Sequence, residues 1–314
     1  MRAIFHYACS QSLSARLAAL APAWLDIRAC PESDDAQLYR LLENADVLLH
    51  VLKPVTAGVM DAAPGLQLIQ KIGVGVNTID LEHARRRAIQ VCNMPGTNSR
   101  AVAEATLMLM LTTLRHARGL DAATRAGDGW RLDPALFDQV GEIGGRTIGL
   151  VGYGAVPTML APVLVALGAR VLYTATAPKA DAVGEWRELP ELLAQSDIVS
   201  LHLPLVAATV RLIDAAALAR MKRGALFINT ARGGLVDQDA LVDALRCGQL
   251  RAAGLDVYDQ EPVPGDLAFF EMDNVVLQPH VAWLTPETLD RSLAVAMEHC
   301  RRLRDGADLL HRVL

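Results

Sequence analysis

The chain has few of the features that mark membrane, secreted or zinc-binding proteins. Its 314 residues include 5 cysteines, an odd number with no CxxC pair, which argues against a structural zinc site and fits reduced thiols in a cytoplasm. The apolar run Leu107–Leu111 is far shorter than the roughly 18–20 residues that span a bilayer. The N-terminus MRAIFHYACSQS becomes polar where a signal peptide would keep its apolar core. We therefore expect a cytoplasmic protein with no membrane partner and no bound metal.

The chain also lacks a long run of positive charge. It has 30 Lys and Arg against 35 Asp and Glu, a formal net charge of −5. DNA and anionic membranes repel such a charge unless a local basic patch attracts them. The basic triplet Arg85–Arg87 is expected on the solvated face of a helix. The balance of charge therefore predicts no nucleic-acid partner.

The length and the hydrophobic pattern indicate two α/β domains. Domains usually have roughly 100–200 residues, so 314 residues suffice for two cores. Short apolar runs alternate with helical patterns along most of the chain, which is typical of βαβ units and parallel sheets. The first series predicts a compact flavodoxin-like domain, with strands at Ala3–Tyr7, Ala45–Val51, Leu66–Lys71 and Ile89–Cys92, and helices at Leu13–Leu20, Asp61–Pro64 and Leu81–Arg87.

A second and more regular series begins at Thr147 and predicts a doubly wound nucleotide-binding sheet. Its six predicted strands are Thr147–Val151, Arg170–Thr174, Ile198–Leu203, Ala225–Thr230, Ala252–Val257 and Val275–Leu277. Between the two series, Ser99–Arg118 is predicted to be one helix of about five turns, apolar on most faces and packed against both domains or a second subunit. The tail from Thr285 is predicted to be an amphipathic helix.

The segment that follows the first strand of this second series predicts a dinucleotide site. Glycines at two positions let the backbone turn sharply and approach a pyrophosphate, and a helix then begins with its free N–H groups facing the phosphates. The residues expected to contact the cofactor there are Gly152, Tyr153, Gly154, Ala155 and Val156. Pro157 replaces the usual third glycine, and Pro162 lies deeper in the helix, where we expect a kink.

The end of the next strand lacks the carboxylate that usually binds the ribose 2′-hydroxyl of NAD. The residues expected to contact the cofactor there are Thr174, Ala175, Thr176 and Lys179. None of them repels a 2′-phosphate. We therefore expect NAD(P) as the cofactor and slightly favour NADP, with NAD left open.

Three later segments place polar residues at the ends of predicted strands, where open α/β sheets bind their ligands. They read NTARGG at 229–234, DVYDQEP at 256–262 and PHVAW at 279–283. With the earlier segments KIGVGVNTID at 71–80 and NSRAVAE at 98–104, they resemble the D-2-hydroxyacid dehydrogenases of the D-isomer-specific family, over nearly the whole chain. That family includes glyoxylate/hydroxypyruvate reductases, glycerate dehydrogenases and phosphoglycerate dehydrogenases.

The resemblance implies how the chain is organised. A doubly wound Rossmann domain, 98–284, would be inserted into a smaller flavodoxin-like α/β domain, 1–97 and 285–314, that binds substrate. It implies a catalytic trio of Arg232, Glu261 and His280, with Thr209, Thr230, Ala231 and Asp256 along the cofactor and with Val74, Gly75 and Arg232 on the substrate. It further implies a homodimer built around the cofactor domain, including Ser99–Arg118 and the loop that carries Trp130.

The chemistry of these residue types agrees with that assignment. Reduction of a 2-oxo acid needs a proton for the new hydroxyl group, and a histidine such as His280 titrates near working pH. A neighbouring carboxylate, Glu261, favours the imidazolium form. The planar guanidinium of Arg232 suits a carboxylate and a keto oxygen. The sequence therefore predicts an NAD(P)-dependent 2-hydroxyacid dehydrogenase that reduces a small 2-oxo acid. The Ala-Trp pair after His280 resembles the glyoxylate/hydroxypyruvate reductase and glycerate dehydrogenase branch, and this resemblance favours glyoxylate or hydroxypyruvate.

Two alternatives stay open. The chain is also compatible with a dinucleotide-sensing, corepressor-like binding protein without turnover, because the prolines and the missing carboxylate leave room for altered cofactor binding. A dehydrogenase of another small anion, such as formate or phosphite, would use the same fold.

Overall fold

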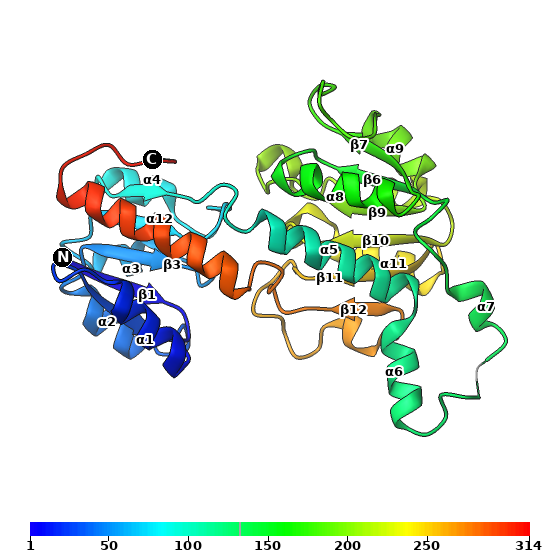
Figure 1. The fold of residues 1–314 in the computed structure, drawn as a ribbon, viewed down its shortest axis with the longest axis horizontal. Helices are drawn as coiled ribbons and strands as arrows, with labels where there is room; N and C mark the ends of the chain where they lie inside the picture. Colours follow the sequence, from blue (N-terminus) through cyan, green and yellow to red (C-terminus); the bar gives the residue numbers. More distant parts are fainter. Residues whose placement is uncertain (132) are drawn as a thin grey trace. The chain divides into compact units, whose positions relative to one another are not determined.

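The computed structural model describes residues 1–131 and 133–314, which form two compact units (Figure 1). Unit 1 comprises Met1–Asn98 and Thr285–Leu314, and unit 2 comprises Ser99–Leu284. Among the helices of the described residues, none has the combination of length and apolar character needed to cross a membrane.

Unit 1 is built on a five-stranded parallel sheet in the order β2-β1-β3-β4-β5. Its strands are β1 (Arg2–His6), β2 (Asp26–Cys30), β3 (Val47–His50), β4 (Leu68–Lys71) and β5 (Gln90–Cys92). Its helices are α1 (Gln11–Leu20), α2 (Asp35–Leu42), α3 (Ala57–Asp61), α4 (Leu81–Arg86) and the C-terminal α12 (Pro286–Arg304). This strand order is that of flavodoxin-like folds, so the predicted architecture is confirmed.

Three elements of unit 1 differ from the sequence-based prediction. Strand β2 lies at the edge of the sheet, and because only every second side chain is turned inward, its sequence DIRAC has no continuous apolar run. Helix α2 was not predicted either; it begins at Asp34, whose side chain accepts a hydrogen bond from the backbone of Gln37. Helix α3 begins after Thr56, whose side chain caps its N-terminus, and it ends at Asp61, the residue at which the predicted helix begins.

Unit 2 contains a seven-stranded parallel sheet in the order β12-β11-β10-β9-β6-β7-β8. Its strands are β6 (Thr147–Val151), β7 (Arg170–Thr174), β8 (Glu185–Trp186), β9 (Ile198–Leu201), β10 (Ala225–Asn229), β11 (Leu250–Leu255) and β12 (Val275–Leu277). Its helices are α5 (Ser99–Leu114), α6 (Ala117–Arg125), α7 (Leu136–Gln139), α8 (Ala155–Ala166), α9 (Leu189–Gln195), α10 (Ala215–Arg220) and α11 (Gln238–Arg246), with 3₁₀ turns η1 (Ala207–Thr209), η2 (Gly233–Leu235) and η3 (Ala268–Glu271). The order is that of a Rossmann sheet, as predicted, but the short edge strand β8 makes seven strands rather than six.

Apolar side chains cover both faces of this sheet. On one face, Leu109 of α5 and Leu160 of α8 belong to the same buried cluster as Ile148 of β6. On the other face, Leu192 of α9 and Leu241 of α11 are buried with residues of β9 to β11. Burial on both faces explains why these strands read as continuous apolar runs that sequence analysis locates well.

One helix of unit 2 ends earlier than predicted, and the two prolines predicted in another lie within it. The predicted helix Ser99–Arg118 ends at Leu114, because His116 adopts a left-handed conformation with φ of 50°, and α6 begins after it. The helix with the predicted kink, α8, runs continuously from Ala155 to Ala166 with Pro162 inside it. Helices α6 and α7 bury no side chain within the described residues, and Figure 1 shows the segment that carries them standing away from the sheet of unit 2.

Candidate active site

The predicted phosphate-binding turn lies at the carboxyl end of β6. Gly152 has φ of 96°, and a Cβ atom added there would lie 2.7 Å from the carbonyl oxygen of His202, so a larger residue does not fit. Gly154 occupies the N-cap position of α8, so no side chain accepts a hydrogen bond from the first turn of the helix. A Cβ atom added at Gly154 would meet nothing within 4 Å. The turn therefore combines a tight backbone with open space in front of the helix.

The first turn of α8 leaves N–H groups available to a ligand. An α-helix does not satisfy its first N–H groups internally, and their positive dipole end favours phosphate. Ala155 is exposed and Val156 partly exposed at this end, whereas Pro157 is buried and has no N–H group. The residues present therefore fit a dinucleotide pyrophosphate, with fewer backbone donors than a glycine in place of Pro157 would provide.

Two tyrosines fix the segment that follows β7. The rings of Tyr153 and Tyr173 lie 4.4 Å apart, and both side chains are buried. The hydroxyl of Tyr173 accepts a hydrogen bond from the backbone N–H of Lys179, at 2.8 Å. The hydroxyl of Tyr153 accepts one from the N–H of Val183, at 2.8 Å, and donates to its carbonyl oxygen, at 3.2 Å. The backbone of the predicted ribose subsite is thus tied to two phenols.

The four residues predicted to contact the ribose lie at the start of this segment. Thr174 and Ala175 are partly exposed, and Thr176 and Lys179 are exposed. The carbonyl oxygen of Thr174 accepts a hydrogen bond from Gly152, so the end of β7 and the phosphate-binding turn are adjacent.

The loop that bears Arg232 follows β10 and is shaped by Asn229. The Asn229 side chain accepts a hydrogen bond from the N–H of Ala231, at 3.0 Å, and donates one to the carbonyl of Arg232, at 2.9 Å. The hydroxyl of Thr230 lies 2.8 Å from that of Thr106 on α5. Asn229 is the first residue of the NTARGG motif and is not among the predicted site residues, although asparagine at a strand end is a common turn signal.

The carboxylate of Glu261 and the imidazole of His280 form a close pair. Nδ1 of His280 lies 2.6 Å from Oε2 of Glu261, and Oε1 of Glu261 accepts a hydrogen bond from the N–H of Tyr258 at 2.9 Å. The His280 side chain is 19 % exposed and the Glu261 side chain 31 %. The pair therefore remains open to a small ligand while the carboxylate fixes one ring nitrogen.

Asp256 orders the backbone around His280. Its buried carboxylate accepts hydrogen bonds from the N–H groups of Val281, at 2.8 Å, and Ala282, at 3.0 Å. His280 has φ of 57°, a left-handed conformation that costs about 1–2 kcal/mol for a residue other than glycine. The contacts of Asp256, with the 3.1 Å bond from the Trp283 indole to the His280 carbonyl, hold this conformation.

The charges of this cluster act on one another. Burial raises the pKa of the Glu261 carboxyl, but the hydrogen bond to His280 and the charges of His280 and Arg232 outweigh it, so the pKa lies below its ordinary value. Burial lowers the pKa of the Arg232 guanidinium, against the opposing charges of Glu261 and Asp256. Burial also raises the pKa of the Asp256 carboxyl. Glu261 thus interacts with both His280 and Arg232, and the structure brings the predicted trio together.

Two further residues of the strand-end motifs, Tyr258 and Gly233, shape this cluster although the sequence predicts no role for them. Besides its N–H bond to Glu261, Tyr258 donates its hydroxyl hydrogen to the carbonyl of Gln278, at 2.8 Å, and so links two strand-end segments. A Cβ atom on Gly233 would lie 1.9 Å from the backbone of Tyr258, so only glycine fits beside Arg232. Such contacts join residues distant in sequence, so spacing alone gave no signal for them.

Thr209, predicted to line the cofactor, lies in η1, and its hydroxyl makes local bonds. It donates to the carbonyl of Pro204, at 2.7 Å, and accepts from the N–H of Val206, at 2.9 Å. Its side chain therefore shapes its own loop.

In unit 1, the predicted substrate residues Val74 and Gly75 lie in a loop after β4. The carbonyl oxygens of Gly73 and Val74 accept hydrogen bonds from the backbone of Met94, at 2.8 Å, and the side chain of Asn93, at 2.9 Å. Within the described part of the chain, the N–H groups of Val74 and Gly75 donate no hydrogen bond. The loop is therefore fixed through its carbonyls while two N–H groups are left available.

Comparison with known proteins identifies the family. Residues 107–282 match the model of the D-isomer specific 2-hydroxyacid dehydrogenase, NAD binding domain. The chain is 39 % identical over 266 residues to a glyoxylate reductase of Thermofilum pendens, covering 83 % of this chain and 78 % of that protein. It is 34 % identical over 259 residues to a hydroxypyruvate reductase of Thermotoga maritima, covering 81 % and 83 %. It is 38 % identical over 273 residues to a D-3-phosphoglycerate dehydrogenase of Mycobacterium leprae, covering 85 % of this chain but only 51 % of that protein, so the chain spans about half of that relative's length.

Solved structures agree with this result. The TT0316 protein of Thermus thermophilus superposes with a TM-score of 0.86 at 37 % identity, over 100 % of both chains. A D-lactate dehydrogenase of Aquifex aeolicus, complexed with NAD and lactic acid, superposes with a TM-score of 0.86 at 26 % identity, over 97 % of this chain and 96 % of that one. The sheet order, the glycine turn and these matches agree, and the chain belongs to the D-isomer specific 2-hydroxyacid dehydrogenase family.

Proposed function

We propose that the protein is a nicotinamide-dependent reductase of a small 2-oxo acid, with glyoxylate or hydroxypyruvate as the favoured substrate. The observation that carries this proposal is the 2.6 Å contact between Glu261 and His280 in a partly exposed cluster that includes Arg232. Relatives named glyoxylate reductase and hydroxypyruvate reductase support the substrate class. A corepressor-like sensor would need no such proton-transfer pair.

In this proposal, unit 2 holds the cofactor through the turn at Gly152–Val156, the end of β7, and the segments at Thr209, Thr230, Ala231 and Asp256. The bound nicotinamide supplies the hydride for reduction. Unit 1 binds the substrate carboxylate through the two available N–H groups of Val74 and Gly75.

In this proposal, residues of the chain stabilise the negative charge that develops on the keto oxygen and supply the proton that the oxygen takes up. Arg232 binds the carboxylate and the keto oxygen, and its positive charge favours the negative charge that develops on that oxygen. His280 donates a proton to the same oxygen, and Glu261 stabilises the imidazolium before transfer and fixes the orientation of the ring. In the reverse direction, neutral His280 accepts the hydroxyl proton.

The substitution His280→Ala tests this assignment. We expect kcat to fall by roughly 10²–10⁴-fold, the usual contribution of a general acid or base, with the dissociation constants of NADH and NADPH unchanged. Absorbance at 340 nm gives the rate and fluorescence titration gives the binding. His311→Ala, an exposed histidine of unit 1, is the matched control and should leave both unchanged. Full activity in His280→Ala would assign the proton transfer to another residue.

A substrate panel distinguishes the function from its alternatives. Glyoxylate, hydroxypyruvate and pyruvate are tested with each cofactor, beside formate and phosphite in the oxidative direction. Turnover of a 2-oxo acid is the expected result. Binding of dinucleotide without any turnover would instead identify a sensor.

For the cofactor, we propose a preference for NADP over NAD. Residues 174–179 contain no carboxylate, and the exposed Thr176 and Lys179 are available to a 2′-phosphate. We expect a higher kcat/KM with NADPH than with NADH. Equal values would contradict this preference.

We also propose a homodimer formed through unit 2. Large apolar side chains are exposed on α5 and α8, among them Met108, Leu111 and Val163, and on the segment after α6, where Trp130 is 88 % and Phe137 87 % exposed. Exposed apolar surface of this extent favours a contact with a second copy. We expect light scattering to give a dimer mass for the wild type and a monomer mass for Trp130→Ser/Phe137→Ser, with Phe270→Ser as the control.

The 5 free cysteines further support a reducing compartment such as the cytoplasm.

A further inference from the structure

A second hollow in unit 2 lies away from the candidate active site. It has a volume of about 440 Å³ and lies at the amino ends of the strands, where Gly224 precedes β10 and Arg251 is the second residue of β11. Arg232, Asp256 and His280 follow the carboxyl ends of β10, β11 and β12. A strand of five residues extends about 17 Å. The hollow is therefore a separate site at the opposite ends of the same strands.

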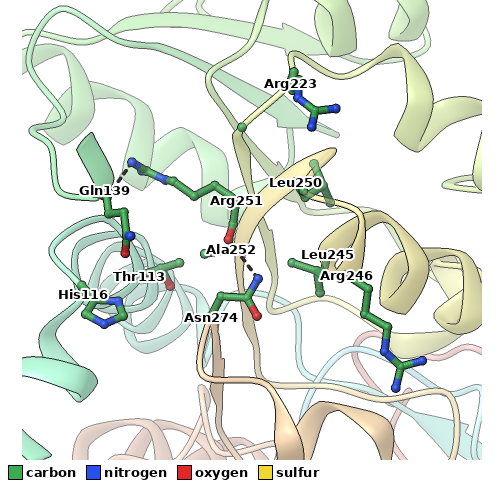
Figure 2. A pocket seen from close by; sticks show the side chains of 12 residues that line it. Thr113, His116, Gln139, Arg223, Leu245, Arg246, Leu250, Arg251, Ala252 and Asn274 are labelled. Carbon is green, nitrogen blue, oxygen red and sulfur yellow. Dashed lines mark hydrogen bonds between the residues drawn. The ribbon is translucent and has the colours of Figure 1, made fainter. Parts of the chain in front are cut away.

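The charged side chains around this hollow are all basic. Arg223, Arg246 and Arg251 line it together with His116, and no Asp or Glu is among its lining residues. None of the three arginines forms an ion pair within residues 1–131 and 133–314. Figure 2 shows Arg223 and Arg246 on one side of the hollow, whereas the side chain of Arg251 extends to the other side, toward Gln139. The chain as a whole has a net charge of −5, so a lining without Asp or Glu makes this hollow a local region of positive charge.

Arg251 is the least exposed of these cations. Burial and the charge of Arg146 both lower the pKa of its guanidinium, so two arginines repel each other here. Its hydrogen-bond acceptor is the carbonyl of Gln139, at 2.6 Å, which carries no full charge. Arg246 lies in the last turn of α11, where the helix dipole favours a cation, but this explanation does not extend to Arg223 or Arg251.

A buried polar atom also lines the hollow. Thr113 of α5 is only 7 % exposed, and its hydroxyl has no hydrogen-bond partner among the described residues. Buried hydroxyl groups are normally hydrogen-bonded, so this one is available to a ligand. The other lining residues include the apolar Leu245, Leu250 and Ala252 and the uncharged polar Gln139 and Asn274.

We propose that this hollow binds a small anion carrying two or more negative charges, such as a phosphorylated or polycarboxylate metabolite. Guanidinium groups match the oxygens of phosphate and carboxylate in geometry and charge. A volume of about 440 Å³ is within the range of small-molecule sites. Such an anion neutralises the arginines, and the Thr113 hydroxyl donates to one of its oxygens.

Isothermal titration of the full chain with pyrophosphate and with citrate tests the proposal. The variant Arg223→Gln/Arg246→Gln removes two exposed cations whose side chains make no hydrogen bond or ion pair with any residue that the structure describes, so we expect the fold to be retained. Arg40→Gln/Arg85→Gln, two exposed arginines of unit 1, is the control with the same change in net charge. We expect at least about 10-fold weaker binding in the first variant, since each charge-assisted hydrogen bond contributes on the order of this factor. The control should bind like the wild type.

Several results would overturn the proposal. Equal binding in wild type and both variants would place the anion elsewhere, for example at the turn of α8. No binding of either anion by the wild type would also exclude the site. If Arg223→Gln/Arg246→Gln changed the mass measured by light scattering, the hollow would be a contact between copies of the chain. Arg251→Gln should weaken binding further, and binding at wild-type strength in that variant would count against the assignment.

Discussion

At the scale of residues, the proposed role of His280 depends on its contact with Glu261. The carboxylate holds one nitrogen of the ring at 2.6 Å, so the other nitrogen is left for a ligand. Tyr258 fixes the carboxylate in turn through its N–H group. The orientation of the imidazole therefore depends on a residue that need not touch the substrate.

We expect Glu261→Gln to lower kcat about 10- to 100-fold with little change in the binding of either cofactor. The amide keeps the shape of the side chain but removes the charge that stabilises the imidazolium, and a hydrogen bond to a charged group contributes about 1.5–3 kcal/mol. Steady-state rates and fluorescence titration measure both quantities. Glu271→Gln, an exposed glutamate of the same unit, is the control. An unchanged kcat in Glu261→Gln would show that the pair has no role in turnover.

The same carboxylate predicts how the site responds to acid. Because the pKa of Glu261 lies below its ordinary value, its charge and its contribution to stability are fully present above about pH 4.5. They are lost only as the pH falls below that value, through the lower pKa of the folded state. We expect the kcat of the wild type to exceed that of Glu261→Gln at neutral pH and to fall toward it only below pH 4.5, where the carboxyl group becomes neutral like the amide. A loss of this difference already above pH 4.5 would contradict the lowered pKa.

At the scale of elements, the segment after β7 depends on its two tyrosines. The N–H groups of Lys179 and Val183 donate to phenol oxygens rather than to a neighbouring strand. The Trp186 indole adds a third bond, to the carbonyl of Ala175, at 3.2 Å. The shape of the proposed ribose subsite is therefore set by side chains from β7, β8 and the glycine turn.

We expect Tyr173→Phe to loosen this segment without unfolding unit 2, because the ring that packs against Tyr153 is kept and only the hydroxyl is lost. Trypsin should cleave after Lys179 several times faster than in the wild type, and the KM for the cofactor should rise while that for the 2-oxo acid stays the same. Mass spectrometry of the fragments and steady-state kinetics check both outcomes. Tyr39→Phe, on an exposed tyrosine of α2, is the control. Cleavage at the wild-type rate would show that the hydroxyl does not hold the segment.

At the scale of the whole molecule, buried histidines make stability depend on pH. Burial lowers the pKa of His202 in unit 2 to about 3 and that of His299 in unit 1 to about 4. In the unfolded chain both gain a proton below about pH 6.5, so the unfolded state binds more protons between that value and the folded pKa. Stability is therefore highest above pH 6.5 and falls as the solution becomes more acidic.

We expect the free energy of unfolding to fall by about 2 kcal/mol for each such histidine between pH 6.5 and 5, since one pH unit corresponds to about 1.4 kcal/mol. Urea unfolding followed by circular dichroism at pH 7.5, 6.5 and 5 measures the change. His202→Gln, which cannot gain a proton in this range, should show a weaker dependence. Identical urea midpoints at pH 7.5 and 5 would show that these imidazoles are not held neutral by the fold.

The sequence by itself determined the two sheets and the polar segments at their ends. Buried parallel strands are apolar throughout and alternate with helical patterns, so β6, β7 and β9–β12 were located from their composition alone. The edge strands β2 and β8 were missed, because strands half open to solvent or only two residues long carry little hydrophobic signal. The end of α5 at Leu114 was missed as well. The residue that adopts the left-handed conformation there is His116, and histidine does not typically end a helix as glycine or proline does.

Only the tertiary structure decided which of the polar residues act together. Arg232, Glu261 and His280 come from three separate segments, and their mutual charge effects depend on burial that no local pattern encodes. The same holds for Asn229, Gly233 and Tyr258, and for the basic hollow at the opposite edge of the sheet. Secondary structure follows from periodicity along the chain, whereas hydrogen bonds between distant residues, burial and the resulting pKa shifts exist only after the chain has folded.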